Sequence, residues 1–423
     1  MTPADTHRTI DAVWRIESPR IIAGIARIVR DLGLAEELAQ DALVAALEQW
    51  PASGIPDNPG AWLTATAKHR AIDHLRRNKR LERKHEELRY QHEGQQQVPD
   101  YDNAIDDDIG DDLLRLVFTA CHPVLSSEAR VALTLRLLGG LTTAEIARAY
   151  LVPEATVAQR IVRAKRTLSE YRVPFEVPRG EELASRLSSV LEVIYLIFNE
   201  GYTATAGNDW TRPELCEDAL RLGRILAELV PNDPEVHGIV ALMEIQASRS
   251  RARVSASGEP ILILDQNRAL WDQLLIRRGL AELERAEKPG GSRGPYTLQA
   301  AIAACHARAL VPEETDWKRI VSLYAELVQL LPSPIVDLNR AVAIAMAFGP
   351  QAGLVLVDQL AAEPALQSYH LLPSVRGDLL TKLGRFGEAR REFERAASLT
   401  RNVRERQLLL ERAEHARAAA SLA

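Results

Sequence analysis

Apolar residues recur at intervals of three and four along nearly all of this 423-residue chain, and this spacing places them on one face of a helix. Ile21, Ile25 and Ile28 form one such stripe, and the same spacing continues through the C-terminal half. Residues 253–264 are an exception, because alternating side chains around a Ser-Gly centre predict a short β-hairpin there. The predicted fold class is therefore all-α, with one short hairpin of strands at most.

Polar and proline-containing segments divide this helical pattern. Residues 91–112 are rich in glutamine, glycine and aspartate and carry a net charge of −8, so we expect a tether that does not pack. Pro174 and Pro178 interrupt the pattern again. The predicted organisation is a first helical domain at residues 1–90, an acidic linker at 91–112, a second helical domain at 113–172 and a helical extension at 173–423.

Small and aromatic residues repeat in the extension in a way that is typical of paired helices. Gly377, Ala389, Phe393 and Ala396 follow one another at offsets of 12, 4 and 3 around a Gly-Arg-Phe-Gly turn. Segments that begin at residues 301, 334 and 368 repeat with a period of about 34 residues, which resembles tetratricopeptide hairpins. We expect the small residues to let two helices approach and the aromatic ring to fill the space beside them.

The distribution of charge and cysteine limits the class of protein. Residues 113–172 carry a net charge of +5, which the acidic linker and an extension of net −4 hide within a total of −6. The longest apolar run, residues 341–348, is far shorter than the roughly 20 residues of a membrane-spanning helix. The N-terminus does not resemble a secretory signal. Cys121, Cys216 and Cys305 do not have metal-type spacing. We expect a cytoplasmic protein with no membrane partner, metal or cofactor.

Residues 141–168 have the pattern of a helix-turn-helix. Thr142 and Glu145 form a capping box before the first helix, and Leu-Val-Pro at residues 151–153 predicts the turn before the second. The inward positions of the second helix are Val157, Ile161, Ala164 and Leu168. The polar and basic side chains left on its other face suit a DNA major groove, where arginine and glutamine read guanine and adenine edges. The alternative is an ordinary helical hairpin with a solvated basic face.

A second basic segment covers residues 59–84. Trp62, Leu63, Ala67 and Ala71 lie on its apolar face, whereas seven lysines and arginines crowd the other face and the C-terminal end. Cations are favoured near a helix C-terminus by the helix dipole, so a solvated face is the alternative here too. The number of cations exceeds what capping requires and favours contact with phosphates.

The order of these segments resembles the sigma-70 family of RNA polymerase initiation factors. An acidic helix at residues 34–50, the segment at 59–77, a linker and the helix-turn-helix at 141–168 follow the small extracytoplasmic-function type, which has regions 2 and 4 with little between them. The block at 113–135 and the motif FNEGYTATAG at 198–207 resemble a subgroup with a long C-terminal extension. The resemblance implies a sigma factor whose partners are core RNA polymerase, through its clamp helices and flap, and promoter DNA.

The resemblance also implies roles for individual residues. Four residues would face the polymerase clamp helices: Glu36, Glu37, Gln40 and Asp41. The −10 element would be contacted by Lys68, Arg70, His74, Arg76, Arg77, Asn78, Lys79 and Arg80. The −35 element would be contacted by Glu154, Thr156, Gln159, Arg160, Arg163, Lys165 and Arg166. The acidic linker could occupy a basic nucleic-acid channel of the polymerase, a hypothesis that rests on its charge alone.

Few features of the sequence indicate an enzyme. The polar cluster at residues 198–202, with Asp209 and Trp210, has no nucleophile–base pair beside it, and we interpret it as a capped helix end, or alternatively as a ligand or interdomain site. Cys121 and Cys305 each stand beside a single histidine, His122 and His306, and such isolated neighbours are more typical of a hydrophobic core than of a metal or catalytic site. We therefore expect no catalytic residues. Two functions remain: a sigma factor that its extension regulates in cis by contacting the sigma domains or polymerase, or a helix-turn-helix regulator with a helical sensor domain.

Overall fold

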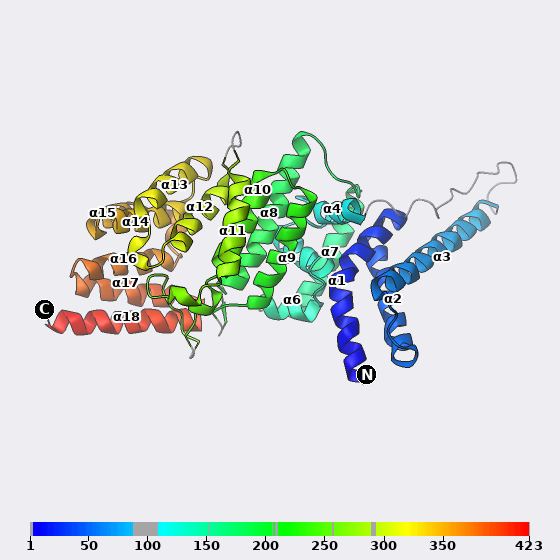
Figure 1. Ribbon diagram of the computed structural model, residues 1–423, viewed down its shortest axis with the longest axis horizontal. Coiled ribbons are helices and arrows are strands. Elements are labelled where there is room, and N and C mark those ends of the chain that lie inside the picture. The colour runs from blue at the N-terminus through cyan, green and yellow to red at the C-terminus, as the bar shows by residue number, and fades with distance from the viewer. Residues whose placement is uncertain are drawn as a thin grey trace. The chain divides into compact units, whose positions relative to one another are not determined.

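Two helical units make up the computed structural model, which describes residues 3–87, 109–150, 152–204, 206–207, 210–255, 258–288 and 293–422. The first unit extends to Ile194 and begins with α1 (Pro3–Val29), α2 (Leu32–Ser53) and α3 (Pro59–Glu87), each packed on the other two (Figure 1). Asp31 caps α2 by accepting a hydrogen bond from the backbone N–H of Leu34 at 2.8 Å. Large side chains that are fully buried here are Ile10, Ile21, Ile25, Trp50 and Leu63.

A second group of helices completes the first unit. It consists of α4 (Ile109–Ala120), α5 (Ser127–Leu137), α6 (Thr143–Tyr150) and α7 (Glu154–Glu170). The central helix is α5, which packs on α4, α6 and α7 and buries Leu133, Leu135 and Leu137. Because α1 packs on both α4 and α5, the two helical groups touch one another.

The first part of α8 (Glu181–Tyr202) also belongs to the first unit. Arg186 of this helix donates a hydrogen bond to the carbonyl oxygen of Phe118 at 2.9 Å, and the Ser189 hydroxyl donates to the carbonyl oxygen of Cys121 at 2.7 Å. The boundary between the two units, at Ile194, lies inside α8. Helix α8 thereby supplies hydrogen-bond donors to carbonyl groups at and just after the C-terminal end of α4.

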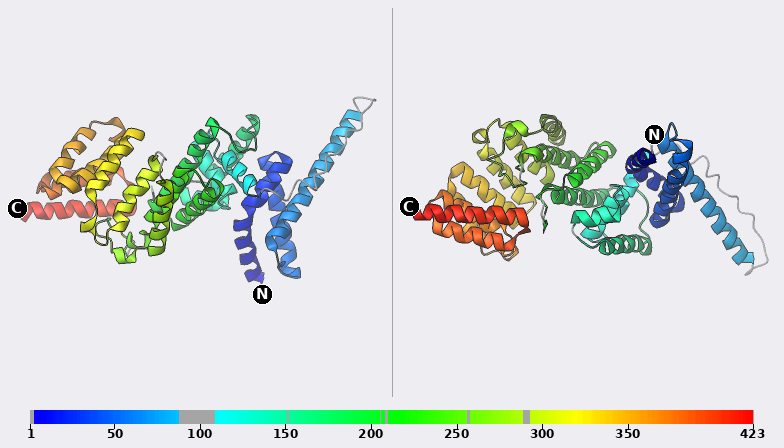
Figure 2. Two further views of the ribbon diagram at one scale, coloured as in Figure 1. Left: turned by 45° about the horizontal axis from the view of Figure 1, so that its top comes forward. Right: turned by 90° about the horizontal axis from the view of Figure 1, so that it is seen from below.

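The second unit is a succession of helices in which most pack on their neighbours along the chain (Figure 2). After the end of α8 they are α9 (Pro213–Leu229), α10 (Pro234–Ala247), α11 (Gln273–Ala286), α12 (Pro295–Arg308), α13 (Trp317–Leu330), α14 (Pro334–Phe348), α15 (Pro350–Leu360), α16 (Leu371–Lys382), α17 (Phe386–Leu399) and α18 (Val403–Leu422). Short 3-10 turns lie at Ser250–Ala252, Arg268–Leu270, Pro312–Glu314 and Pro364–Leu366. Proline at the first helical position starts several of these helices, where its missing N–H needs no partner.

The predicted packing of small and aromatic residues is confirmed where α16 meets α17. A methyl group added at Gly377 would lie 2.8 Å from a ring carbon of Phe393, which is itself buried. Ala389 and Ala396 are also fully buried in this cluster. The helices approach so closely because glycine and alanine leave room for the ring.

Strands are sparse in the described residues, and their place differs from the prediction. Within residues 253–264 an antiparallel bridge joins Val254 to Pro260, and the described residues around it do not extend it into strands. Proline has no N–H to donate to a longer ladder. Instead, β1 (Ala206–Gly207) pairs in parallel with β2 (Arg401–Asn402), a pairing that the sequence pattern does not indicate.

Candidate nucleic-acid and polymerase interface

The helix-turn-helix is formed by α6 and α7, and its capping box is present. Glu145 accepts a hydrogen bond from the backbone N–H of Thr142 at 2.8 Å, and the Thr142 hydroxyl accepts one from the N–H of Glu145 at 3.2 Å. The inward side chains of α7 are buried as predicted: Val157, Ile161, Ala164 and Leu168. This packing fixes which face of α7 remains accessible.

The predicted −35 contacts divide by exposure. Glu154, Gln159, Arg163 and Arg166 are exposed, while Thr156, Arg160 and Lys165 are partly buried. Arg166 pairs with Glu170 along the helix at 2.7 Å, which positions its guanidinium without removing it from solvent. Lys165 differs from the others because it pairs with Glu36 of α2. Most of this set therefore shares one accessible face of α7, and Lys165 points to another helix.

The predicted −10 contacts lie along α3, whose opposite face buries Leu63, Ala67 and Ala71. The exposed members are Arg76, Arg77, Asn78 and Arg80, and the partly buried members are Lys68, Arg70 and His74. Asn78 and His74 are hydrogen-bonded through their side chains at 2.9 Å, and Arg70 pairs with Asp41 of α2 at 3.1 Å. The Lys79 side chain lies outside the described residues. The C-terminal half of α3 thus presents a cluster of cations to solvent.

The predicted polymerase contacts on α2 do not share one environment. Glu37 and Asp41 are exposed, whereas Glu36 is 4% exposed. The Gln40 amide donates a hydrogen bond to Glu36 at 2.8 Å. The acidic helix therefore exposes some of its carboxylates and keeps one of them buried.

Glu36 is buried between two cations of the second helical group. Its carboxylate accepts from the Arg136 Nε of α5 at 2.7 Å and pairs with the Lys165 ammonium of α7. Burial by itself would raise the pKa of Glu36, but the charge and hydrogen bond of Lys165, and then those of Arg136, outweigh it and lower the pKa. The carboxylate is therefore ionised and fully paired at neutral pH.

Sequence reasoning missed Arg136 as a partner in this interface. Arg136 is 100 residues from Glu36 in the sequence, and Lys165 is 129 residues away. Arg136 occupies the last turn of α5, where a cation is favoured by the helix dipole in any case. No local pattern distinguishes such a cation from one that pairs with a distant helix.

The C-terminal end of the predicted acidic linker, residues 91–112, overlaps a helix. Helix α4 begins at Ile109, and Asp112 is 4% exposed and pairs with Arg115 at 2.7 Å and with Arg27 of α1 at 3.0 Å. Acidic side chains in the first turn of a helix are stabilised by its dipole, which explains why the polar composition does not prevent helix formation here. The rest of the linker, including Asp106, Asp107 and Asp108, lies outside the described residues.

The polar cluster of the extension forms internal contacts. Glu200 pairs with Arg212, and the Arg253 guanidinium lies 3.4 Å from the centre of the Tyr202 ring. Arg253 also donates to the backbone carbonyl of Tyr202 and to the Thr203 hydroxyl. These contacts join the C-terminal end of α8 to the residue before α9 and to the segment after α10. Asp209 lies outside the described residues.

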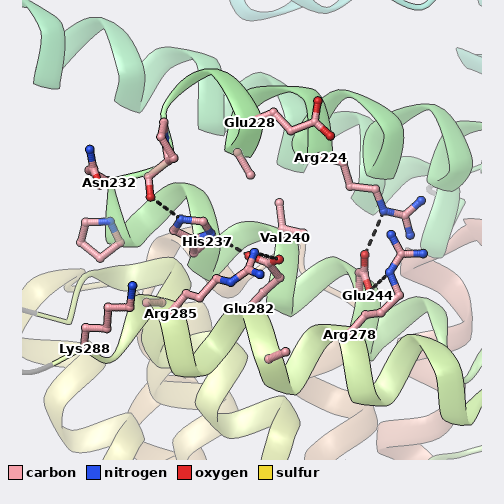
Figure 3. A pocket seen from close by; sticks show the side chains of 15 residues that line it. Arg224, Glu228, Asn232, His237, Val240, Glu244, Arg278, Glu282, Arg285 and Lys288 are labelled. Carbon is pink, nitrogen blue, oxygen red and sulfur yellow. Dashed lines mark hydrogen bonds and ion pairs between the residues drawn. The ribbon is translucent and has the colours of Figure 1, made fainter.

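A cavity of about 810 Å³, lined by both charged and apolar side chains, lies between α9, α10 and α11 (Figure 3). Glu244, on its floor, pairs with Arg224 at 2.9 Å and with Arg278 at 3.7 Å. His237 contacts Glu282 through Nδ1 at 2.6 Å and donates from Nε2 to the carbonyl oxygen of Pro231 at 2.8 Å. These contacts link α10 to α9 and to α11.

The two cysteine–histidine pairs are parts of cores. Burial raises the pKa of the Cys121 thiol to about 11, and its sulfur lies 3.3 Å from the Thr134 hydroxyl. His306 stacks edge-on against Trp317. Among the described residues, no group of three or more His, Cys, Asp or Glu is placed to hold a metal ion. Nor does the described part of the chain contain a helix long and apolar enough to cross a membrane.

Three sequence families match successive parts of the chain. Residues 14–81 match Sigma-70 region 2, residues 115–168 match Sigma-70 region 4, and residues 186–287 match a family of unknown function, DUF6596. The first match covers α2 and most of α3, and the second covers the helix-turn-helix. The third begins inside α8, at the arginine that bonds to Phe118.

Individual relatives match different lengths of the chain. The uncharacterized protein R00370 of Rhizobium meliloti is 41% identical over 401 residues, which cover 94% of this chain and 93% of that protein. The ECF RNA polymerase sigma factor SigK of Mycobacterium ulcerans is 31% identical over 155 residues, covering 35% of this chain and 78% of SigK. The probable ECF RNA polymerase sigma factor SigI of Mycobacterium tuberculosis is 28% identical over 171 residues, covering 40% of this chain and 58% of SigI.

Among solved structures, yeast Tom70 matches with a TM-score of 0.32 and 12% identity, over 93% of this chain and 82% of Tom70. A likeness at that level supports no conclusion about function. The sequence matches to regions 2 and 4 and to SigK show the family. The chain belongs to the extracytoplasmic-function group of the sigma-70 family of RNA polymerase sigma factors, and it carries a long helical C-terminal extension.

Proposed function

We propose that α7 reads the −35 element of a promoter, that α3 contacts the −10 element, and that α2 binds the clamp helices of core RNA polymerase. The observation that carries this proposal is the separation of faces on α7, where four apolar side chains are buried and Glu154, Gln159, Arg163 and Arg166 remain exposed. Arginine and glutamine on one helix face suit base edges in a major groove. The exposed cations of α3 suit phosphates.

The chain then needs no cofactor and no catalytic group of its own, because core polymerase catalyses RNA synthesis. Its partners would be core polymerase, through the clamp helices and flap, and promoter DNA. Its location would be the cytoplasm, where these partners are found. The alternative of a free-standing operator-binding regulator is disfavoured by α2, since exposed Glu37 and Asp41 have no use on DNA.

Run-off transcription tests the proposal. Core polymerase would be mixed with the full chain and pooled genomic fragments of the source organism, and the 5′ ends of the transcripts would be sequenced. We expect a defined set of start sites that the double variant Arg160→Ala/Arg163→Ala loses and the control variant Arg179→Ala keeps, because Arg179 is exposed but lies outside α7. DNA binding without core polymerase, together with no transcripts, would instead support the regulator.

We further propose that the extension regulates these activities in cis through α8. The supporting observation is that α8 contributes Arg186 and Ser189 to the group of α4–α7 and continues into the second unit. A chain that ends near Gly180 would remove these contacts, so the informative comparison is between the full chain and one that ends after Thr203. Equal transcription by the two chains would contradict regulation by the second unit.

A further inference from the structure

The cavity between α9, α10 and α11 carries more positive than negative charge on its walls. Four arginine and lysine side chains line it, against three glutamates. Two of the glutamates, Glu244 and Glu282, are already paired with arginines, and the third, Glu228, is exposed on α9. A volume of about 810 Å³ lies within the range of small-molecule sites, which is roughly 300–1,000 Å³. Both the charge and the size of the cavity therefore suit a small anionic ligand.

Two guanidinium groups from different helices meet at one end of this cavity. Arg224 of α9 contacts one carboxylate oxygen of Glu244 through Nε at 2.9 Å, and Arg278 of α11 approaches the other oxygen through Nε at 3.7 Å. Figure 3 shows both guanidinium groups turned toward Glu244 of α10. The Glu244 side chain is only 2% exposed, so the packing of α10 fixes its position. Glu244 thus holds Arg224 and Arg278, here called the arginine pair, together.

The terminal nitrogens of the arginine pair remain available to a ligand. Both contacts with Glu244 use Nε, and among the described residues no acceptor is hydrogen-bonded to an Nη atom of Arg224 or Arg278. One carboxylate balances only one of the two guanidinium charges, so one positive charge is left over. Guanidinium groups bind carboxylate and phosphate oxygens well, because their N–H groups form a planar fork that matches these acids.

We propose that the arginine pair binds the acid group of a small organic anion, a carboxylate or a phosphate monoester, whose apolar body lies in the cavity. The body would lie against Ala227, Val240 and Ala281, which also line the cavity. Ala227 and Ala281 each follow one of the paired arginines by three residues, so they lie about one helical turn away on the same face. The site is separate from the proposed roles of α2, α3 and α7, since every lining residue belongs to the second unit.

The other charges of the cavity favour a ligand with a single acid group. Arg285 is paired with Glu282 at 2.8 Å, and the charges of Lys288 and Glu228 offset one another in the sum. The excess of one positive charge is therefore that of the arginine pair. An acidic peptide would bring several carboxylates toward Glu228 and Glu282, which would repel them, whereas one acid group matches the excess.

Ligand-observed NMR titration of the full chain tests the site at constant ionic strength. The probes are benzoate, phenyl phosphate and benzamide, which share one ring and differ in the charged group. Millimolar dissociation constants are expected for probes of this size, so the titration would extend to about 20 mM. We expect at least one of the two anions to bind about tenfold more tightly than benzamide, and the comparison of the two anions identifies the preferred acid group. Binding of neither anion, or equal binding of benzamide, would overturn the proposal.

Substitution of one member of the arginine pair should weaken binding of the anions alone. Arg278→Gln removes a charged donor, so the dissociation constant of the anion should rise about tenfold while that of benzamide stays unchanged. The matched control is Arg277→Gln, because Arg277 is exposed on the same helix but is not a lining residue of the cavity. This control should keep the wild-type affinity. An equal loss in both variants would mean that the anions respond to the general charge of α11, and the proposal would fall.

A second variant fills the cavity and leaves every charge in place. Ala281 is an exposed lining residue of α11, so Ala281→Phe adds a ring to the cavity without burying it in a core. Thermal unfolding checks that this variant and Arg278→Gln are folded. We expect Ala281→Phe to abolish binding of the anions, because the new ring occupies the place of the ligand's apolar body. Anion binding at the wild-type affinity in this variant would place the anions outside the cavity and overturn the proposal.

Discussion

Arg130 of α5 donates a hydrogen bond to a carboxylate oxygen of Glu192 on α8, with 3.1 Å between Nη1 and Oε2. The same guanidinium bonds to Ser189, and its other terminal nitrogen donates to Ser127 at 3.1 Å. Arg130 is 8% exposed, and the match to region 4 ends at residue 168, before α8 begins. Helix α8, which begins the extension, is therefore held against α5 of region 4 by hydrogen bonds from Arg130.

Replacing Arg130 with Met should loosen α8 from region 4. The loss of hydrogen bonds by Ser189 and Glu192 should cost about 2 kcal/mol of local stability, since Glu192 is half exposed and recovers hydration. Hydrogen exchange of the α5 and α8 amides measures this local opening. Arg285→Met, which removes an exposed pair within α11, is the control and should leave exchange in α5 unchanged. Unaltered exchange in Arg130→Met would show that α8 is held by other interactions.

Replacing Arg76 and Arg77 with Ala should weaken promoter binding by the polymerase complex without selecting among sequences. Both side chains are exposed at the C-terminal half of α3 and would bind phosphates. The slope of log affinity against log salt should fall by about one for each phosphate that the variant no longer binds. Filter binding over a range of salt concentrations gives this slope. A slope equal to that of the wild type would exclude phosphate binding by these residues.

Gly377→Ala should destabilise the second unit by about 1–3 kcal/mol, because the new methyl group would press on the Phe393 ring. Gly387→Ala is the matched control. It lies in α17 with nothing within 4 Å of the added methyl group, so helix propensity makes it neutral or stabilising. Urea unfolding followed by helical circular dichroism compares the two. Equal midpoints would show that α16 and α17 separate easily.

His306→Phe should make the stability of the second unit less dependent on pH. Burial, followed by repulsion from Arg249 and Arg268, lowers the pKa of His306 to about 4. Between its ordinary pKa of about 6.5 and this value, the unfolded chain binds a proton that the folded chain does not, so the free energy of unfolding falls as the pH falls. The decrease from this group reaches about 3 kcal/mol near pH 4.

Phenylalanine keeps a ring against Trp317 and does not titrate. The difference in the free energy of unfolding between wild type and His306→Phe should therefore change in favour of the variant as the pH falls from 7 to 4. Denaturant unfolding at several pH values measures it. A constant difference would mean that His306 titrates alike in the folded and unfolded chains.

Features determined by neighbouring residues could be predicted from the sequence. The capping box of Thr142 and Glu145, the buried stripe of α7 and the close approach at Gly377 depend on side chains a few residues apart or on a repeated helical hairpin. The resemblance to sigma regions 2 and 4 likewise follows from local motifs and from their order along the chain. The predicted hairpin is reduced to a bridge between Val254 and Pro260, because proline has no N–H to donate to a longer ladder. Helix α4 begins inside the predicted linker, because acidic residues that disfavour packing elsewhere are stabilised in the first turn of a helix.

Tertiary structure alone decided which charges are buried. Glu36 and Glu37 are adjacent acids on α2, yet the first is enclosed by Arg136 and Lys165 and the second is exposed. Helical periodicity assigns each residue to a face, but it does not say which distant helix covers that face. Long-range Coulomb attraction and desolvation depend on which helix covers that face, and so does the packing of α8 against region 4.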